Sequence, residues 1–449
     1  MRKLFAIWLG KLIALASKIT GGQSTSAPGL FALKICPDLI KRLAGYIEKG
    51  VIITCGTNGK TTTNNLMATV LEAKGYHVVC NKVGANMISG IATVLLKECN
   101  LFGKFHADYA CLEVDEAYSV HVLDQIKPDI MVVTNLFRDQ LDRYGEIDIT
   151  TELLKESISK APDVKLVLNA DDPLCAQFGV LPNVEPFYYG VSEKVLPQQN
   201  DTKEARFCPI CGHEQEYDYY HYSQLGSYRC NHCGFARPQP EYNVTDVSLK
   251  TPMQFTINGN SISVPYKGFY NIYNLAAVYA AMSVAGEDAS NFEQLLDAYR
   301  PQTGRMQEFT LAEKQVILSL SKNPAGFNQA ITTVNTDHRK KDVVIAINDN
   351  VNDGRDISWL WDVDFQAIKD EYLNTLTTSG IRRYDLSLRF KYEDVTVDYT
   401  ESDMKTAILN CLKTDSEVVY LLFNYSCMYS TEAVVKELEK ELGGGNQHE

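Results

Sequence analysis

Residues 54–63 read TCGTNGKTTT, and they stand between the apolar run GVII and the stretch NNLMATVLEAKG, which has the pattern of a helix. A strand, a glycine-containing turn and a helix in this order are the setting of a phosphate-binding loop. Gly56 and Gly59 allow a tight turn in which backbone N–H groups face phosphate oxygens, and the helix start adds its dipole. The general pattern G-x-x-x-x-G-K-[ST] has a glycine where this chain has Thr54. The stretch therefore predicts a nucleotide-binding site built on a shortened form of this loop motif.

Two side chains of this loop have the right chemistry for a nucleotide. Lys60 can neutralise the β- and γ-phosphates, and Thr61 can offer its hydroxyl group to Mg²⁺. The competing interpretation is a chance G-x-x-G-K-T in an unrelated loop, and the flanking strand and helix make it the weaker one.

Apolar strand-like runs alternate with helical stretches from about residue 46 to residue 170. This alternation is typical of a parallel, doubly wound α/β sheet. Cysteines, tyrosines and prolines interrupt it, a hairpin turning at Asn258-Gly259 follows, and the alternation restarts near residue 306. The predicted organisation is an N-terminal helical segment (1–45), a P-loop ATPase domain with a parallel sheet (46–305), an insertion within it (200–240), and a smaller Rossmann-like α/β domain (306–449).

The first residues, MRKLFAIWLGKLIALASKITGG, combine a positive start with an apolar stretch that Lys11 and Lys18 interrupt. They predict an amphipathic helix rather than a signal peptide or a membrane span. It either packs on the body of the protein, which we favour, or lies on a membrane surface. Its broad apolar stripe consists of Phe5, Trp8, Leu9, Leu12, Ile13 and Ala16.

The amino-acid composition and net charge exclude some classes of protein. The chain has 449 residues, 45% of them hydrophobic, and a formal net charge of −13, which fits a packed globular protein and argues against a nucleic-acid binder. Eight of the twelve cysteines are scattered singly among apolar residues, as expected in a reducing cytoplasm.

The other four cysteines form two C-x₂-C pairs, CPIC (208–211) and CNHC (230–233), separated by eighteen residues. This spacing predicts a tetrahedral zinc ribbon, and four thiolates would close the coordination shell, so the Zn²⁺ would be structural. The predicted ligands are Cys208, Cys211, Cys230 and Cys233, with His213 and His232 as alternative ligands.

GTNGKTTT resembles the ATP-binding loop of the Mur ligase family, which uses this shorter form. Further similarities follow in the family's order: CLEVDE (111–116), TNLFRDQLDRYGE (134–146), LNADDP (168–173), YNIYNLAAVYA (270–280) and GRMQ (304–307). The resemblance implies an ATP site made of Gly56, Thr57, Asn58, Gly59, Lys60, Thr61, Thr62, Asn274 and Arg305.

The same resemblance implies that Thr61 and Glu113 hold Mg²⁺, with Lys60 and Glu113 acting in catalysis. Glu113 could instead simply end a strand, and Asn274 could be a helix N-cap. Gln140 stands where many family members have a histidine that helps to bind the metal.

The cysteine insertion narrows the resemblance to the MurT branch of the family, the synthetase subunits of lipid II isoglutaminyl synthase. INDNVNDGRDISWLWDVDF (347–365) is similar to that branch's D-G-x-D-x-S-W motif, whose second aspartate completes a catalytic triad with a cysteine and a histidine of a separate glutaminase. By position this catalytic residue is Asp356, with Asp353 as the second choice; most of the other acids in the segment are expected to form turns and caps.

The resemblance implies ATP-dependent amidation of the D-glutamate α-carboxylate in the lipid II stem peptide. The partner would be a class I glutaminase-type amidotransferase (GatD-like) in a heterodimer, in the cytoplasm near the inner face of the membrane. Independently, no cysteine lies in a G-x-C-x-G elbow, so the chain is not expected to release ammonia itself. The rivals are an ordinary Mur-type or folylpolyglutamate-type amino-acid ligase and a nucleotide-binding zinc scaffold without enzymatic activity.

Overall fold

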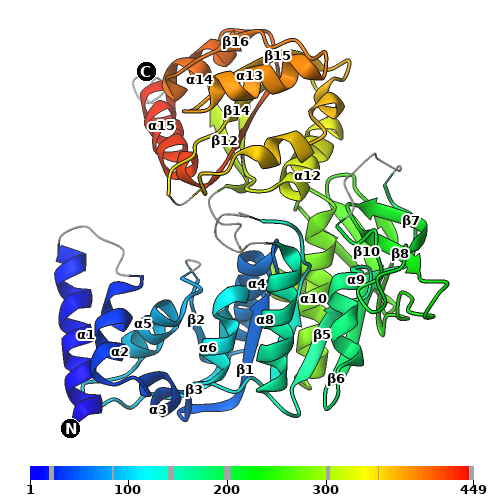
Figure 1. Cartoon of the computed structure of the whole chain (residues 1–449). Helices are drawn as coiled ribbons and strands as arrows, with labels where there is room; N and C mark the ends of the chain where they lie inside the picture. The colour runs from blue at the N-terminus through cyan, green and yellow to red at the C-terminus, as the bar shows by residue number, and fades with distance from the viewer. Residues whose placement is uncertain are drawn as a thin grey trace.

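Two mainly parallel sheets form the framework of the protein (Figure 1). The computed structural model describes residues 1–19, 25–82, 85–139, 146–196, 204–299, 304–351 and 353–443. In these ranges the larger sheet has the order β11-β10-β9-β6-β5-β4-β1-β3-β2. Its strand pairs are parallel except β9–β10 and β10–β11 at one edge, so β10 runs against the other strands. Its strands are β1 (Ile47–Cys55), β2 (Val78–Cys80), β3 (Ala107–Glu113), β4 (Ile130–Val133), β5 (Lys165–Asn169), β6 (Glu185–Val191), β9 (Tyr242–Ser248), β10 (Met253–Ile257) and β11 (Asn260–Val264).

Helices cover both faces of this sheet, which is why its strands are apolar on both sides. In β3, for example, Tyr109 and Cys111 belong to one core, and Ala110 and Leu112 belong to the other. The predicted doubly wound sheet is confirmed. One face carries α4 (Lys60–Ala73), α10 (Tyr270–Val284) and α11 (Phe292–Leu296), and the other carries α1 (Arg2–Ile19), α2 (Ala27–Ile35), α3 (Leu39–Ala44), α5 (Ile88–Glu98), α6 (Ser119–Leu123) and α8 (Ile147–Ser159).

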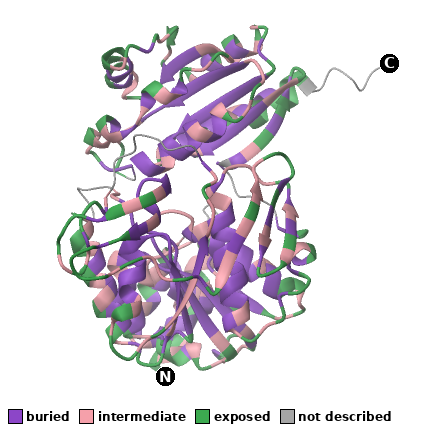
Figure 2. Cartoon of the chain, turned by 90° about the vertical axis from the view of Figure 1, so that its right-hand side faces the viewer, coloured by how far each residue is buried: buried purple, intermediate pink, exposed green. Residues whose placement is uncertain are grey.

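The smaller sheet begins at β12 and has the order β12-β13-β17-β14-β15-β16, parallel from β13 onward. Its buried strands stand out in Figure 2. The predicted restart of strand–helix alternation is confirmed; the analysis of the sequence missed β15, whose residues LNTLTTS are largely polar. The elements are β12 (Arg305–Leu311), β13 (Lys314–Leu320), α12 (Pro324–Asn335), β14 (Lys341–Ala346), β15 (Leu373–Ser379), α13 (Arg383–Tyr392), β16 (Tyr399–Thr400), α14 (Met404–Leu412), β17 (Val418–Phe423) and α15 (Tyr425–Gly443).

The cysteine-rich insertion lies between β6 and β9 and contains a two-stranded hairpin, β7 (Glu216–Tyr222) and β8 (Leu225–Arg229). Figure 1 shows it on the side of the large domain that lies away from α1. It is fastened there by a buried polar group: Arg237 Nε donates to Asp171 Oδ1 at 2.7 Å, and the Tyr273 hydroxyl donates to Asp171 Oδ2 at 2.7 Å. The insertion is therefore joined to both β5 and α10.

Helix α1 packs on the body of the protein, as predicted, but through a different face. The buried residues are Ala6, Ile7 and Gly10, whereas Phe5 and Trp8 of the predicted stripe are exposed. The reason is close packing: a Cβ on Gly10 would lie 2.3 Å from Leu96 Cδ1, so small residues face the neighbouring helices. In the described part of the chain, no helix is long and apolar enough to cross a membrane.

Gly29 tests the close contact between α2 and α5. A Cβ at this position would lie 2.0 Å from the Ser89 backbone oxygen, and Gly29 N donates to Thr93 Oγ1 at 2.8 Å. We expect Gly29→Ala to destabilise the protein by about 1–3 kcal/mol because the backbones must separate. The matched control is Gly45→Ala, since nothing lies within 4 Å of a Cβ there and its φ of −65° suits alanine. Thermal unfolding should show a lower Tm for Gly29→Ala alone, and equal Tm values would contradict the proposed packing.

Candidate nucleotide and metal sites

The loop between β1 and α4 has its predicted form, and its geometry explains Thr54. Thr54 is buried inside β1, paired with Glu113 of β3 and Val132 of β4, so it belongs to the sheet and not to the loop. The loop proper is Gly56 to Gly59, and both glycines have positive φ, 121° and 83°. A Cβ on Gly56 would lie 2.2 Å from Thr134 Oγ1, so a larger residue does not fit there.

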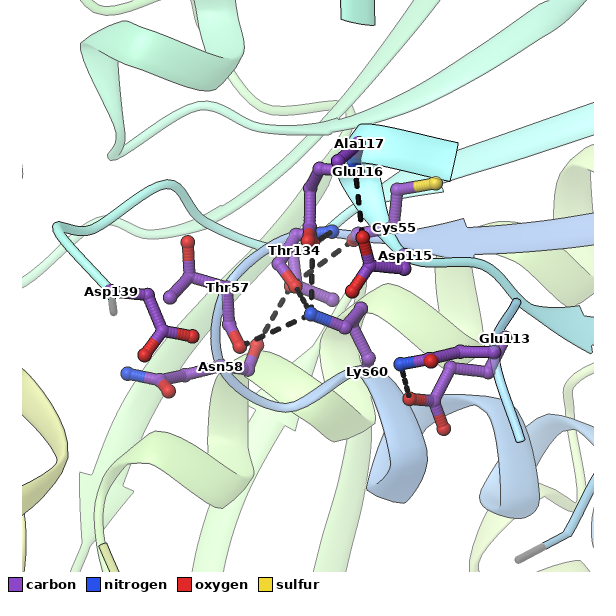
Figure 3. A network of polar contacts seen from close by, with 12 residues as sticks. Cys55, Thr57, Asn58, Lys60, Glu113, Asp115, Glu116, Ala117, Thr134 and Asp139 are labelled. Carbon is purple, nitrogen blue, oxygen red and sulfur yellow. Dashed lines mark hydrogen bonds and ion pairs between the residues drawn. The ribbon is translucent and has the colours of Figure 1, made fainter. Parts of the chain in front are cut away.

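Lys60 lies at the first turn of α4, and its side chain is almost fully buried. Its ammonium group donates to Glu116 Oε1 at 2.8 Å, as Figure 3 shows. It also donates to the Gly56 carbonyl oxygen. Burial alone would lower the pKa of Lys60, but the nearby carboxylates of Glu116, Asp115 and Glu113 raise it above its usual value. Lys60 is therefore held as a cation.

Glu116 was missed by the analysis of the sequence. It follows β3 and, in addition to binding Lys60, accepts a hydrogen bond from Gly56 N at 2.7 Å. Burial raises the pKa of Glu116, although the Lys60 charge lowers it. The Glu116 carboxylate thus accepts hydrogen bonds from one backbone N–H group and from the lysine of the loop. Phosphate oxygens would accept hydrogen bonds from donors of the same kind. Its sequence signal was the last glutamate of EVDE, three residues beyond the glutamate that we singled out.

Glu113, the predicted metal ligand, ends β3 and is 3% exposed. Asn81 fixes its backbone by hydrogen bonds of 2.8 Å to both its N–H and its carbonyl group, and Asn86 Nδ2 donates to Oε1 at 3.0 Å. Oε2 is buried without a hydrogen-bond partner among the described residues. A buried carboxylate oxygen without a partner is costly, and a divalent cation would satisfy it, so this residue fits a Mg²⁺ ligand. Thr61 lies nearby in the first turn of α4.

The segment after β4 forms the outer wall of the loop. Asn135 Oδ1 accepts from Asn58 N at 2.8 Å, its Nδ2 donates to the Asn58 carbonyl at 3.0 Å, and Thr134 Oγ1 donates to the same carbonyl at 2.8 Å. Thr57 Oγ1 and Phe137 N are 3.0 Å apart. The predicted TNLFRDQLDRYGE segment therefore begins by fixing the loop backbone, whereas Gln140 lies outside the described residues.

Asn274 comes to the loop from α10. Its side chain is 3.3 Å from Thr63 Oγ1, and a Cβ on Gly59 would lie 2.2 Å from its Oδ1. The alternative interpretation of Asn274 as a helix N-cap is wrong, because α10 already begins at Tyr270. The side chain of Arg305 lies outside the described part of the structure; its backbone starts β12.

The smaller sheet contributes a contact that we did not predict. Asn323, the N-cap of α12, exchanges hydrogen bonds of 3.0 and 3.2 Å with the side chain of Asn58. Beside it, Lys322 forms an ion pair with Asp139. The two units thus meet directly at the phosphate loop.

The four predicted cysteine ligands converge in the insertion. Their sulfur atoms all lie within 4.8 Å of one another, with 3.6 Å between Cys208 and Cys233 and 3.5 Å between Cys211 and Cys230. The Cys233 backbone N–H group helps to lower the pKa of Cys230 to about 6, whereas burial raises the pKa of Cys208 to about 12, so the geometry of the four sulfur atoms is what indicates a metal site. His213 and His232 stack with ring centroids 3.5 Å apart, and with Cys211 they form a second group of candidate ligands.

The acidic segment after β14 contains aspartates in different settings. Asp353 is buried, and it accepts from Ser426 N at 2.7 Å and from Asn350 N at 3.2 Å. Asp356 is partly exposed, and its Oδ1 accepts from Ser358 N at 2.8 Å. Asp364 caps a 3₁₀ turn, as expected for most acids of this segment. Of the two candidate triad residues, Asp356 is the accessible one.

These features define a class of protein: an α/β protein in which a loop of the phosphate-binding type, a buried metal-ligand candidate and a second α/β unit meet at the carboxyl ends of parallel strands. Family models match in two places, the Mur ligase middle domain over residues 53–282 and the MurT ligase C-terminal domain over residues 320–428. The chain belongs to the MurT family of Mur ligases.

The relatives agree with this assignment. The chain is similar to the lipid II isoglutaminyl synthase (glutamine-hydrolyzing) subunit MurT of Staphylococcus aureus (strain COL), with 34% identity over 99% of this chain and 100% of the relative. The MurT subunit of Streptococcus pneumoniae (strain ATCC BAA-255 / R6) is 32% identical over 91% of both chains. A pseudomurein peptide ligase type C from Methanothermus fervidus superimposes with a TM-score of 0.69, at 24% identity, over 89% of this chain and 81% of that one. MurF ligase from Thermotoga maritima gives 0.63, at 16% identity, over 92% and 84%.

A substitution at Gly59 tests whether the close contact between the loop and Asn274 is needed for ATP binding. We expect Gly59→Ala to weaken ATP binding by about tenfold or more, because the new methyl group would displace Asn274 and distort the donors of the loop. Gly75→Ala is the matched control: its φ of 91° carries the same backbone strain, but nothing lies within 4 Å of a Cβ there. Isothermal titration calorimetry measures both affinities, and an equal loss in the two variants would assign the effect to backbone strain alone.

Proposed function

We propose that this protein catalyses the ATP-dependent amidation of the D-glutamate α-carboxylate in the lipid II stem peptide, giving D-isoglutamine for peptidoglycan synthesis. The observation that carries the proposal is the similarity to MurT subunits over 99% of the chain. The site agrees with it, because a phosphate loop and a metal-ligand candidate meet a second α/β unit that carries an accessible aspartate.

The carboxylate must first be activated, because an amine that attacks its carbon cannot expel O²⁻ as a leaving group. A carboxylate oxygen of the substrate attacks the γ-phosphorus of ATP, the bond to the bridging oxygen breaks, and ADP leaves. Ammonia then attacks the carbonyl carbon of the acyl phosphate, inorganic phosphate leaves with the C–O bond electrons, and ammonia loses a proton. Such phosphoryl transfer depends mainly on positioning and on electrostatic stabilisation.

The loop residues have distinct roles in this proposal. Lys60 neutralises phosphate charge as the reaction proceeds, and the backbone N–H groups at the N-terminus of α4 bind phosphate oxygens. Thr61 and Glu113 would hold Mg²⁺, which when bound supplies further positive charge at the phosphates. The remaining ATP contacts are assigned to Thr57, Asn58, Thr62, Asn274 and Arg305.

We assign the supply of ammonia to another protein, because no cysteine outside the four-cysteine cluster has an activated thiol. Burial raises the pKa of each of the eight cysteines outside the cluster; for Cys80, Cys411 and Cys427 it rises to about 12. A glutaminase nucleophile requires the opposite, a thiol with a lowered pKa. We therefore assign the glutamine hydrolysis to a GatD-like class I glutaminase bound as a heterodimer.

Asp356 is the residue that we assign to the partner's catalytic triad. A carboxylate in that position would orient the histidine and stabilise its protonated form. Five residues further along the chain, Trp361 is 54% exposed and packs edge-on against Tyr392 with ring centroids 5.3 Å apart. Tyr384, Leu388 and Tyr392 form an exposed stripe along α13 at helical spacing. These side chains are our proposed docking surface for the glutaminase.

The cysteine cluster is proposed to bind one structural Zn²⁺. Four sulfur atoms within 4.8 Å of one another match a tetrahedral site, and a closed shell of thiolates leaves no position for catalysis. We also propose the domain limits 1–45, 46–305 with the insertion 200–240, and 306–449, the last with Rossmann-like topology. The protein would work in the cytoplasm near the inner face of the membrane, where a lipid-linked substrate is present.

Two substitutions separate the proposed roles. In the complex with the glutaminase, Asp356→Asn should abolish glutamine-dependent amidation of lipid II and leave ammonia-dependent amidation unchanged, because only the partner's triad is broken. Lys60→Ala should lower both activities by about 100-fold or more, since both need phosphate activation. Mass spectrometry of the lipid II product measures the amide formed.

Asp415→Asn is the control for Asp356, since it removes another exposed aspartate of the same domain. Loss of both activities in Asp356→Asn would contradict its assigned role. If the isolated chain joined an amino acid to the precursor, the protein would be an ordinary ligase. If it turned over no ATP with any of these substrates, it would be a nucleotide-binding scaffold.

Metal analysis tests the cluster. The purified protein should contain about one zinc ion per chain, and Cys211→Ser together with Cys230→Ser should remove it and lower the Tm. Cys80→Ser, which changes a partly exposed cysteine outside the cluster, should keep the metal. Elemental analysis by mass spectrometry measures the content; an equal zinc content in all three proteins would contradict the proposed ligands.

A further inference from the structure

Helix α1 carries an apolar stripe on the side that faces away from the protein. Its members recur at intervals of three and four residues, so they lie along one face of the helix. The packed face, with Ala6, Ile7 and Gly10, is on the opposite side. The stripe consists of Phe5, Trp8, Leu12, Leu15 and Ile19, each 51–77% exposed.

A neighbouring loop extends this surface. The Trp8 indole nitrogen donates to the Leu101 carbonyl oxygen at 2.8 Å, and a Cβ on Gly103 would lie 2.5 Å from Ile7 Cδ1. The loop therefore lies against α1, and its Leu101 and Phe102 are 61% and 74% exposed. Exposed side chains of this size in one continuous patch mark an interaction surface.

The charge of this region is opposite to that of the rest of the chain. Residues 1–37 contain Arg2, Lys3, Lys11, Lys18 and Lys34 but no aspartate or glutamate, whereas the whole chain has a formal net charge of −13. Lys11 and Lys18 lie on the helix between the packed face and the stripe. Long lysine side chains in such positions can bury their methylene groups and keep the ammonium group at a polar boundary.

We propose that α1, with Leu101 and Phe102, docks on the surface of an anionic phospholipid bilayer. The apolar stripe enters the boundary between headgroups and acyl chains, and the flanking cations contact the lipid phosphates, so the helix lies parallel to the membrane. Figure 1 shows α1 at the outer edge of the large domain, on the side away from the insertion, where a flat surface can reach it. The proposal concerns binding alone and does not depend on the amidation reaction.

A second copy of the chain is the main competing occupant, because spacings of three and four also suit a helix pair. Two α1 helices would, however, bring the cations of both copies together with no acidic residue in either segment to pair with them. Anionic lipid supplies that opposite charge. The charge pattern thus favours the bilayer.

Vesicle flotation of the full-length protein tests the proposal. We expect binding to vesicles with about one-third phosphatidylglycerol in phosphatidylcholine, little binding to pure phosphatidylcholine, and weaker binding as salt is raised. Leu12→Gln together with Leu15→Gln should lower the partition to anionic vesicles by about tenfold or more, because both side chains leave the apolar phase. Both positions are exposed and glutamine is a good helix former, so the fold should be retained.

The control changes two exposed apolar residues elsewhere, Ile149→Gln and Val180→Gln, and should bind as the unchanged protein does. Equal binding of the Leu12/Leu15 variant and this control would overturn the proposal, as would equal binding to neutral and anionic vesicles. A concentration-dependent dimer that dissociates only in the Leu12/Leu15 variant, without vesicle binding, would overturn it in favour of self-association. Light scattering after size-exclusion chromatography detects that outcome.

Discussion

The buried positive charge of Lys60 is the constraint on which the arrangement of the site depends. An ammonium group that is almost fully buried is stable only where carboxylates compensate for the lost water. Glu116 provides this compensation at 2.8 Å, and it can do so only because β3 lies directly beside β1. The parallel register of these two strands then also brings Glu113 to the loop. One electrostatic requirement and one strand pairing therefore position both the candidate phosphate-binding cation and the candidate metal ligand.

Features that depend on short sequence distances could be predicted. The loop, the strand–helix alternation and the two C-x₂-C pairs each have a local pattern that backbone geometry or metal coordination requires. The contacts of Lys60 with Glu116, of Asn58 with Asn135, and of Asn58 with Asn323 were not predicted, because they join residues 56, 77 and 265 positions apart. Only the tertiary fold brings such residues together.

The errors have equally specific causes. Helix α1 is apolar over most of its circumference, so periodicity could not decide which face packs; small residues with close neighbours decided it. The N-cap alternative for Asn274 failed because α10 begins a full turn earlier than its apolar pattern. Strand β15 was missed because five of its seven residues are polar, although its last four are buried. In each case tertiary packing overrode a local preference.

The insertion is connected to the loop by a continuous series of contacts. Arg237 holds Asp171, and the next residue, Asp172, accepts from Leu136 N at 2.8 Å, beside the Phe137 that contacts Thr57. Burial raises the pKa of Asp172 to about 6 even though several donors hold it. The insertion therefore has a structural consequence at the phosphate loop: it fixes the carboxyl ends of β4 and β5, from which one wall of the loop is built. A structural metal held by the four cysteines, as we propose, would in this way support a reaction that takes place elsewhere in the molecule.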